Sequence, residues 1–236
     1  MAEILKSAGR HKILAIMAGF NGENPLRLVE EAGRTAYQSR DKIGEGTAEK
    51  FCEMIRRLGH ESVLEHSSMS VEFSGYSRGM THELVRHRVA SFTQESTRYV
   101  DEKEFRVVLP PHKDENEKLV EIIIGEAPVK AVLKLSAKDW VQLNEQMYRG
   151  LRLAGWLPED ARQLLPTGIE SQIVMTANLR EWRHVFKLRC DKKAHWEIRH
   201  AMVNLLKDVK QRIPVIFDDF VIDENALEAH IEKPQV

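Results

Sequence analysis

Residues 169–190 read IESQIVMTANLREWRHVFKLRC, and this stretch passes from one structural pattern to another without a linker. Residues 169–176 form an apolar-rich run of strand length. Asn178 then carries a side chain suited to cap a helix, and the residues after it are apolar at helical spacing. A strand that leads directly into an amphipathic helix predicts a fold that contains both kinds of element.

The rest of the chain repeats both patterns in an irregular order. Helices are predicted over residues 25–39, 47–59, 77–89, 131–153, 178–190 and 194–212, with a short one that opens at Pro158 and ends at Pro166. Strands are predicted over residues 13–17, as a buried strand, and over residues 68–75 and 105–109. Residues 114–126 fit neither pattern, and a short acidic tail follows the last helix. Because no linker or repeat divides the chain, we expect one α+β domain over residues 1–236.

The composition is that of a soluble globular protein. Of the 236 residues, 42% are hydrophobic and 30% are charged, and the formal net charge is −1. This balance argues against broad electrostatic binding to nucleic acid or to an anionic membrane. No apolar run reaches the length of a spanning helix, and the two cysteines, Cys52 and Cys190, form no disulfide framework. We therefore expect a cytoplasmic protein with no nucleic-acid partner and no membrane partner.

A basic motif at residues 86–88, Arg-His-Arg, is the first candidate for function. Arginine offers planar paired donors for phosphate or carboxylate, and the loop at residues 91–99 adds hydroxyl groups. A solvated basic helix end is the alternative interpretation. On the predicted helix, however, His87 falls on the apolar stripe of Met80 and Leu84, which favours a binding role.

The helix predicted after Asn178 carries the second candidate, Arg189. Trp182, Val185 and Phe186 form the centre of an apolar face, and Arg189 projects within the same arc. A charge in such a place needs a partner or a ligand. Either a buried ion pair, for which Glu197 is a candidate partner, or an arginine aimed into a ligand pocket satisfies that need. Asn178 is also placed so that the amides beside it can meet a phosphate.

Residues 59–66, GHESVLEH, contain two histidines and two glutamates and are the third candidate. His60 and His66 are six residues apart, which puts them on opposite faces of a helix, and the segment lacks the usual zinc spacings. We therefore predict no metal, and a turn that contacts a ligand instead. The chain also lacks the glycine-rich dinucleotide and P-loop motifs and the nucleophile elbow of hydrolases. Cys190 is interpreted as a packing residue.

Four blocks of the sequence together resemble one enzyme family. Arg86-His87-Arg88 followed after seven residues by Ser96 matches the R-H-R-x₇-S signature of the flavin-dependent thymidylate synthases, the ThyX family. Residues 59–66, 159–166 and 178–199 resemble further blocks of that family and occur in its order. The resemblance extends over residues 33–201.

The resemblance implies a homotetramer of α+β subunits, each with an antiparallel or mixed sheet flanked by long helices. It implies FAD bound at subunit interfaces, tightly and without a Rossmann motif. The implied reaction converts dUMP to dTMP, with methylenetetrahydrofolate as the carbon donor and NADPH as the reductant through the flavin. No cysteine nucleophile is needed in this family.

The resemblance also assigns roles to individual positions. Those implied to contact FAD are Ser62, Arg86, His87, Arg88, Gln94, Asn178, Leu179, Arg180 and His184. Those implied to contact dUMP are Glu83, Leu84, Val85, Arg86, Gln94, Glu95, Ser96, Thr97, Arg98, Arg162 and Arg189, with Arg162 and Ser96 on its phosphate. Arg189 is the implied catalytic residue, placed against the uracil ring, where a permanent positive charge stabilises the anionic form of the ring. Family members often carry Gln at position 83 and Glu at position 94, and this chain has the reverse.

Two other functions compete with this one. A flavoprotein that oxidises NADPH but has another substrate would share the flavin residues and ignore dUMP. A single-stranded nucleic-acid-binding module would use Arg86, Arg88, Arg98 and Tyr99 as a basic patch with aromatic stacking, although the net charge of −1 counts against it.

Overall fold

The computed structural model describes residues 2–6, 9–18, 24–99, 104–125 and 131–232. Its contacts divide the chain into two compact units. Unit 1 consists of Met1–Gly9, Ser74–Thr81 and Gln94–Gln172, and unit 2 consists of Arg10–Phe73, His82–Thr93 and Ile173–Val236. Single-domain organisation over residues 1–236 stays a prediction. The α+β class is confirmed, because helices occur with both parallel and antiparallel strand pairs.

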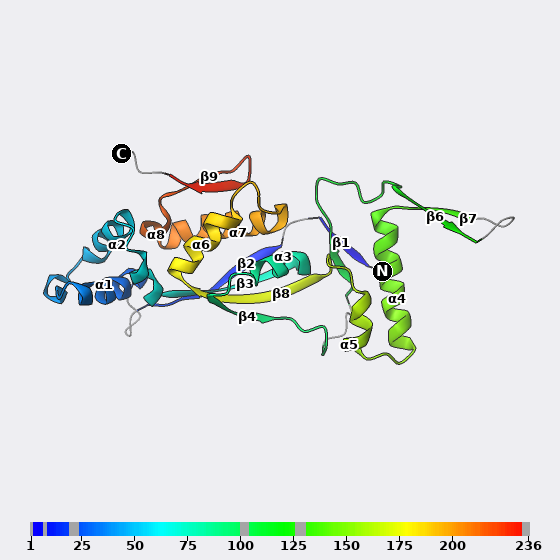
Figure 1. The fold of residues 1–236 in the computed structure, drawn as a ribbon, viewed down its shortest axis with the longest axis horizontal. Helices are drawn as coiled ribbons and strands as arrows, with labels where there is room; N and C mark the ends of the chain where they lie inside the picture. The colour runs from blue at the N-terminus through cyan, green and yellow to red at the C-terminus, as the bar shows by residue number, and fades with distance from the viewer. Residues whose placement is uncertain (1, 7–8, 19–23, 100–103, 126–130, 233–236) are drawn as a thin grey trace. The chain divides into compact units, whose positions relative to one another are not determined.

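Most of the residues of a four-stranded sheet belong to unit 2 (Figure 1). Its strand order is β2 (Arg10–Ile16), β3 (Ser68–Ser77), β8 (Glu170–Asn178) and β4 (Ala90–Gln94), and β3 and β8 continue into unit 1. Met69, Val71 and Phe73 of β3 are buried, as their alternation predicts. The expectation of a buried first strand is wrong, because β2 alternates exposed and half-buried residues and Leu14 is 45% exposed.

Helices and one hairpin complete unit 2. Helices α6 (Leu179–Arg189) and α7 (Trp196–Arg212) lie over one face of the sheet in Figure 1. Trp182 and Phe186 of α6 are fully buried, and the Trp182 indole N–H donates to the Met69 carbonyl of β3 at 3.0 Å. The other elements of the unit are α1 (Pro25–Ala36), η1 (Arg40–Lys42), α2 (Thr47–Arg57), η2 (Glu61–His66), α8 (Pro214–Phe217), β9 (Phe220–Asp223) and β10 (Glu228–Ile231), together with the end of α3 (Arg78–Leu84).

The close packing of α1 on α2 depends on Gly33. A Cβ atom built at Gly33 would lie 2.4 Å from the Phe51 ring, whereas one at Gly150, on an exposed part of α4, would meet nothing within 4 Å. We therefore expect Gly33→Ala to lower the free energy of unfolding by about 1–3 kcal/mol through overpacking. Gly150→Ala is the matched control and should raise the free energy of unfolding by up to about 1 kcal/mol, because alanine favours helix. Denaturant unfolding of both variants measures this, and equal effects of the same sign would contradict the packing.

Unit 1 has its own hydrophobic core. Strand β1 (Glu3–Leu5) pairs in parallel with β5 (Arg106–Val108). The helices of this unit include α4 (Ala137–Leu153), α5 (Pro158–Ala161), η3 (Arg162–Leu164) and the start of α3. Strands β6 (Val120–Ile124) and β7 (Ala131–Leu135) form an antiparallel hairpin. The buried side chains of this core are Phe105, Val107, Val141, Tyr148, Ala161 and Ile169.

Three sequence predictions need correction. Helix α3 ends at Leu84 instead of residue 89, so the basic motif lies in the turn after the helix. Residues 131–135 are the strand β7, because Ser136 and Asp139 form a capping box that sets the start of α4 at Ala137. The predicted acidic tail contains the hairpin of β9 and β10. Within the described residues, none of the helices has both the length and the apolar character that crossing a bilayer requires.

Candidate functional site

The start of helix α6 is fixed by its cap and by the strand before it. The Asn178 side-chain oxygen accepts from the Glu181 amide at 2.8 Å, which is the predicted N-cap. The Leu179 amide donates to the Ser67 carbonyl at 2.9 Å. These two amides are therefore satisfied within the protein, and fewer N–H groups are available to a phosphate than the sequence predicts.

A pocket of about 440 Å³ opens beside this helix, within unit 2. Three residues predicted to contact FAD, Asn178, Arg180 and His184, line it. Its other lining residues are Glu61, Glu65, Val89, Glu181, Arg183, Lys187 and Ile231. The pocket thus combines basic, acidic and apolar groups, and its volume lies within the range of small-molecule sites.

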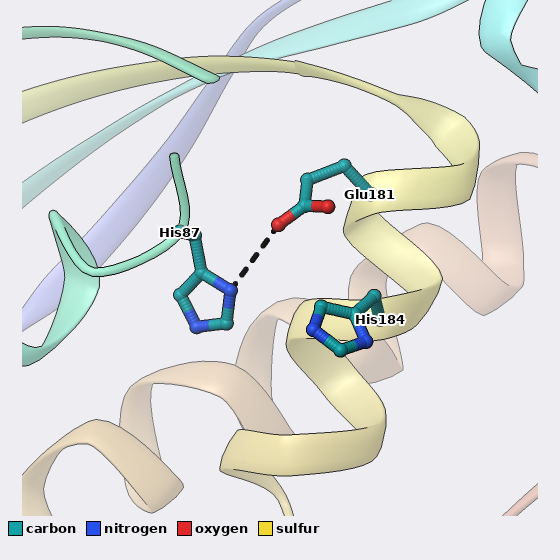
Figure 2. Close-up of side chains that lie close together, drawn as sticks. All are labelled: His87, Glu181 and His184. Atoms are coloured by element: carbon teal, nitrogen blue, oxygen red, sulfur yellow. Dashed lines mark hydrogen bonds and ion pairs between the residues drawn. The ribbon is translucent and has the colours of Figure 1, made fainter. Parts of the chain in front are cut away.

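His87 lies beside this helix and joins two of its residues. Its Nδ1 atom is 3.2 Å from the Glu181 carboxylate, and its Nε2 atom accepts from the Arg189 Nε at 3.0 Å. Figure 2 shows the contact between His87 and Glu181. The rings of His87 and His184 meet edge to face, with centroids 5.9 Å apart. His87 is only 5% exposed, in agreement with its predicted place on an apolar face. It lies after the end of α3, however, so the apolar face of a helix is not what buries it.

These contacts define the protonation of His87. A guanidinium has only donors, so the Nε2 atom must carry a lone pair and the proton must be on Nδ1, directed at Glu181. Burial, which is the largest cause, together with the charge of Arg189 and the neighbouring His184 lowers the pKa of His87 from 6.5 to about 4. Burial also raises the pKa of the Glu181 carboxyl. At neutral pH the imidazole is therefore neutral.

This lowered pKa predicts a loss of stability in mild acid. The unfolded chain protonates His87 as the pH falls through about 6.5, while the folded protein resists until about 4. The stabilising contribution of His87, about 2–3 kcal/mol, is therefore complete above that window and is lost as the pH falls across it. Urea unfolding from about pH 7.5 to about pH 4.5 should show a shallower decline in His87→Gln than in the wild type. Parallel declines would contradict the lowered pKa.

His87, Glu181 and His184 offer ligand atoms that lie within 4.8 Å of one another, a spacing that a metal ion can bridge. The hydrogen bond from Arg189 argues against that use. It occupies the Nε2 lone pair of His87 and leaves the Nδ1 position protonated, so His87 has no free lone pair to give. The cluster of residues 59–66 is engaged differently, because Glu61 pairs with Arg183 and Glu65 with Arg180.

Arg189 has a partner that the sequence did not predict. Its NH1 donates to the Glu83 carboxylate at 2.8 Å and its NH2 to the Glu83 carbonyl at 3.0 Å, whereas a pairing with Glu197 stays a prediction. The Arg189 side chain is 20% exposed, at the end of α6. The Glu83 carboxylate, which stands where the family often has an amide, is thus the counterion of the predicted catalytic arginine.

The predicted nucleotide residues that lie in unit 1 form a second cluster. The side-chain amide of Gln94 donates to the buried hydroxyls of Thr81 at 2.8 Å and Ser171 at 3.1 Å. The backbone N–H of Glu95 donates to the backbone carbonyl of Gln172 at 2.9 Å. All three bonds attach the end of β4 to its surroundings. Gln94 is therefore a support for the loop that follows it.

That loop and η3 each contribute an arginine beside one acid. Arg98 donates to the Glu159 carboxylate through Nε at 3.2 Å, and Arg162 donates to the Glu159 carbonyl at 3.1 Å. Arg162 also approaches the Thr97 hydroxyl at 3.5 Å, and the Ser96 hydroxyl accepts from the Arg98 amide at 3.3 Å. The structure thus brings together, within unit 1, four residues predicted to contact dUMP: Ser96 and Arg162, the two predicted on its phosphate, and Thr97 and Arg98.

The remaining predicted residues differ in their exposure. Leu84 and Leu179 are fully buried in the core, so their side chains cannot face a ligand. Val85, Arg86 and Arg88 follow α3 and are exposed, and Ser62 lies exposed on η2. Burial raises the pKa of Cys52 to about 12 and also raises that of Cys190, which fits the packing role predicted for Cys190.

Two residues of this region were missed by the sequence interpretation. Glu181 is three residues after the N-cap Asn178, a spacing that indicates helix capping and conceals its contact with His87. Arg183 is 5% exposed, which makes it the most deeply buried of the three arginines of α6, and it pairs with Asp219 and Glu61. Only the fold, which brings Asp219 beside α6, reveals that role.

Comparison with known proteins places this chain in a family. The family model for the thymidylate synthase complementing protein matches residues 19–215. A flavin-dependent thymidylate synthase of Mycolicibacterium vanbaalenii is 39% identical over 199 residues, which cover 83% of this chain and 79% of that protein. The chain belongs to the flavin-dependent thymidylate synthase family. The same-named protein of Mycobacterium leprae is 40% identical over 205 residues, covering 83% of this chain and 80% of that one.

Solved structures share the fold of this flavin-dependent thymidylate synthase family member. The UMP/dUMP methylase PolB from Streptomyces cacaoi, bound with 5-Br dUMP, has a TM-score of 0.69 at 22% identity over 92% of this chain and 95% of that one. Thymidylate Synthase X from Helicobacter pylori, with FAD and dUMP, has a TM-score of 0.63 at 21% identity over 93% and 99%. At these identities the likeness shows the fold, and it confirms the fold expected from the four sequence blocks.

Proposed function

We propose that this protein catalyses the reductive methylation of dUMP to dTMP, with methylenetetrahydrofolate as the carbon donor. Family membership supports the reaction. The observation that carries it in this chain is the placement of Arg189, whose guanidinium is held by Glu83 and His87 at the end of the helix that begins beside the pocket. A fixed, partly buried arginine suits a reaction in which negative charge develops on a pyrimidine ring.

FAD is the proposed cofactor, and the pocket beside α6 fits part of it. Arg180 and Lys187 supply positive charge for a diphosphate, while Val89 and His184 supply surfaces for a flat ring. Bound FAD supplies the hydride that completes the methyl group, with electrons from NADPH. Ser62, Arg86, Arg88 and Gln94 stay proposed contacts, taken over from the family resemblance.

Arg189 is proposed to act on the uracil ring. Three of its N–H groups are used by Glu83 and His87, which leaves two of its five donors for a ligand. A guanidinium stays charged at any physiological pH, so it can stabilise an anionic imide throughout the reaction. That stabilisation raises electron density at C5 of the ring, which attacks the folate-derived carbon.

The phosphate of dUMP is assigned to the loop at residues 96–98 and to Arg162. Arg98 is exposed and is held by Glu159, which also organises Arg162 through its carbonyl. A phosphate carries more charge than the single carboxylate of Glu159, so it competes well for both arginines. The formal net charge of −1 counts against a nucleic-acid-binding module.

We further propose that the enzyme is a homotetramer with shared active sites and that it acts in the cytoplasm. NADPH and methylenetetrahydrofolate are the proposed co-substrates. The family resemblance supports each of these, and size-exclusion chromatography with light scattering tests the tetramer.

A visible absorption spectrum tests the cofactor and the nucleotide together. The purified protein is incubated with FAD, desalted and titrated with dUMP, with dCMP as the control nucleotide. We expect flavin bands that survive desalting and shift with dUMP but not with dCMP. Retained flavin that ignores dUMP would indicate an NADPH-oxidising flavoprotein with another substrate. Loss of all flavin would contradict the proposal.

A further inference from the structure

The guanidinium of Arg189 is held at three points. Its Nε donates to His87 at 3.0 Å, its NH1 to the Glu83 carboxylate at 2.8 Å and its NH2 to the Glu83 carbonyl at 3.0 Å. Because the group is planar, contacts at all three nitrogens fix both its position and its orientation. NH1 and NH2 each have a second N–H that makes none of these contacts. Because the guanidinium is fixed, the direction of each of these two N–H groups is fixed as well.

His87 is itself held on its other side by Glu181. Its Nδ1 lies 3.2 Å from the Glu181 carboxylate, and Glu181 is fixed in the first turn of α6 by the Asn178 cap. The four side chains form a chain of hydrogen bonds from Glu83 through Arg189 and His87 to Glu181. Both ends of helix α6 contribute to it, since Glu181 lies in its first turn and Arg189 is its last residue.

We propose that Glu83 and Glu181 are positioning residues that fix the guanidinium of Arg189, Glu83 directly and Glu181 through His87. The inference rests on the function proposed for Arg189. Glu83 and Glu181 need not touch a substrate for this role, because each acts through a neighbour.

The role of Glu181 follows from the two tautomers of a neutral imidazole. Only the tautomer with its proton on Nδ1 can accept from Arg189, and a carboxylate facing Nδ1 selects that tautomer. Without an acceptor there, the proton is free to occupy Nε2. His87 would then present an N–H to the guanidinium and displace it from its position.

Alanine and glutamine variants separate positioning from simple loss of charge. Glu83→Ala and Glu181→Ala remove an acceptor, whereas Glu83→Gln and Glu181→Gln keep a side-chain oxygen that can accept. At saturating FAD, we expect kcat for dTMP formation to fall about 10- to 100-fold in the alanine variants, because a small misplacement of a catalytic group has effects of that size. The glutamine variants should recover most of the loss, and the KM for dUMP should change less than kcat.

The matched control is Glu224→Ala, which removes a 74% exposed acid of unit 2 that pairs only with a lysine in the described contacts. We expect its kcat to equal that of the wild type. Thermal unfolding of every variant, followed by circular dichroism, identifies any that fail to fold. A folded Glu83→Ala or Glu181→Ala protein with wild-type kcat would overturn the proposal for that residue.

Histidine-selective ¹⁵N NMR of the FAD-loaded protein supplies a readout that does not depend on turnover. We expect His87, assigned by its loss in His87→Gln, to carry its proton on Nδ1 at neutral pH, and to lose that preference in Glu181→Ala. A proton on Nε2 of His87 in the wild type would overturn the proposed chain of hydrogen bonds from Glu83 to Glu181. If the wild type forms no dTMP, the proposed function fails, whereas the NMR result still decides whether Glu181 orients His87.

Discussion

We expect Arg189→Ala to keep its FAD but to lose dTMP formation by about 10²- to 10³-fold, the effect of removing one preorganised electrostatic donor from a site. The loss should appear in kcat, since the charge on the uracil develops during the reaction. FAD is retained because Arg189 is absent from the residues that line the pocket beside α6. Single-turnover formation of dTMP, with the flavin content measured by absorbance, checks both parts.

Arg189→Lys provides the companion variant. Lysine keeps the charge but cannot make the planar contacts to His87 and to the carboxylate and backbone carbonyl of Glu83. We expect it to recover little of the lost kcat. A lysine variant with the turnover of the wild type would show that charge alone suffices, and an alanine variant with that turnover would remove Arg189 from the reaction.

Arg183→Ala has the largest expected effect on stability, a fall of about 3 kcal/mol in the free energy of unfolding. Arg183 is buried and donates to both carboxylate oxygens of Asp219, at 2.8 and 2.7 Å, and to Glu61 at 2.9 Å. When Arg183 is removed, Arg56, at 3.2 Å, is the ion-pair partner that remains for the Asp219 carboxylate among the contacts of the described residues. The expected loss is therefore near the lower end for a broken buried ion pair.

Arg180→Ala is the control for this stability measurement, because Arg180 is on the same helix and also pairs with a glutamate but is 51% exposed. An exposed pair contributes less than about 1 kcal/mol. Urea unfolding of both variants should therefore separate them clearly. Equal losses would mean that burial does not determine the strength of the Arg183 pair.

The elements with strong periodicity were predictable from the sequence. The cap at Asn178, the buried face of Trp182, Val185 and Phe186, and the alternation of β3 all appear as expected, because local sequence and burial agree there. Boundaries set by a competing local signal were not. The capping box of Ser136 and Asp139 starts α4 at Ala137, although the apolar residues before it fit a longer helix. The basic motif at residues 86–88 lies after the end of α3 at Leu84, although its spacing predicts a helix.

The candidate site was predictable as a set of residues but not as a set of contacts. The resemblance to the family selected Arg189, His87 and Glu83, and the structure brings these three together. The pairing of Arg189 with Glu83, 106 positions apart, depends on how the chain folds and has no signal in local spacing. The same is true of Glu181, whose position in the sequence resembles an ordinary helix cap.

One measurement tests the central claim most directly. The purified protein is supplied with FAD, dUMP, methylenetetrahydrofolate and NADPH, and dTMP is quantified by chromatography, with each component omitted in turn and with Arg189→Ala in parallel. We predict dTMP only when all components are present, and a fall of at least about 10²-fold in the variant. Failure of the complete mixture to form dTMP, or equal formation when FAD is omitted from flavin-free protein, would contradict a flavin-dependent thymidylate synthase.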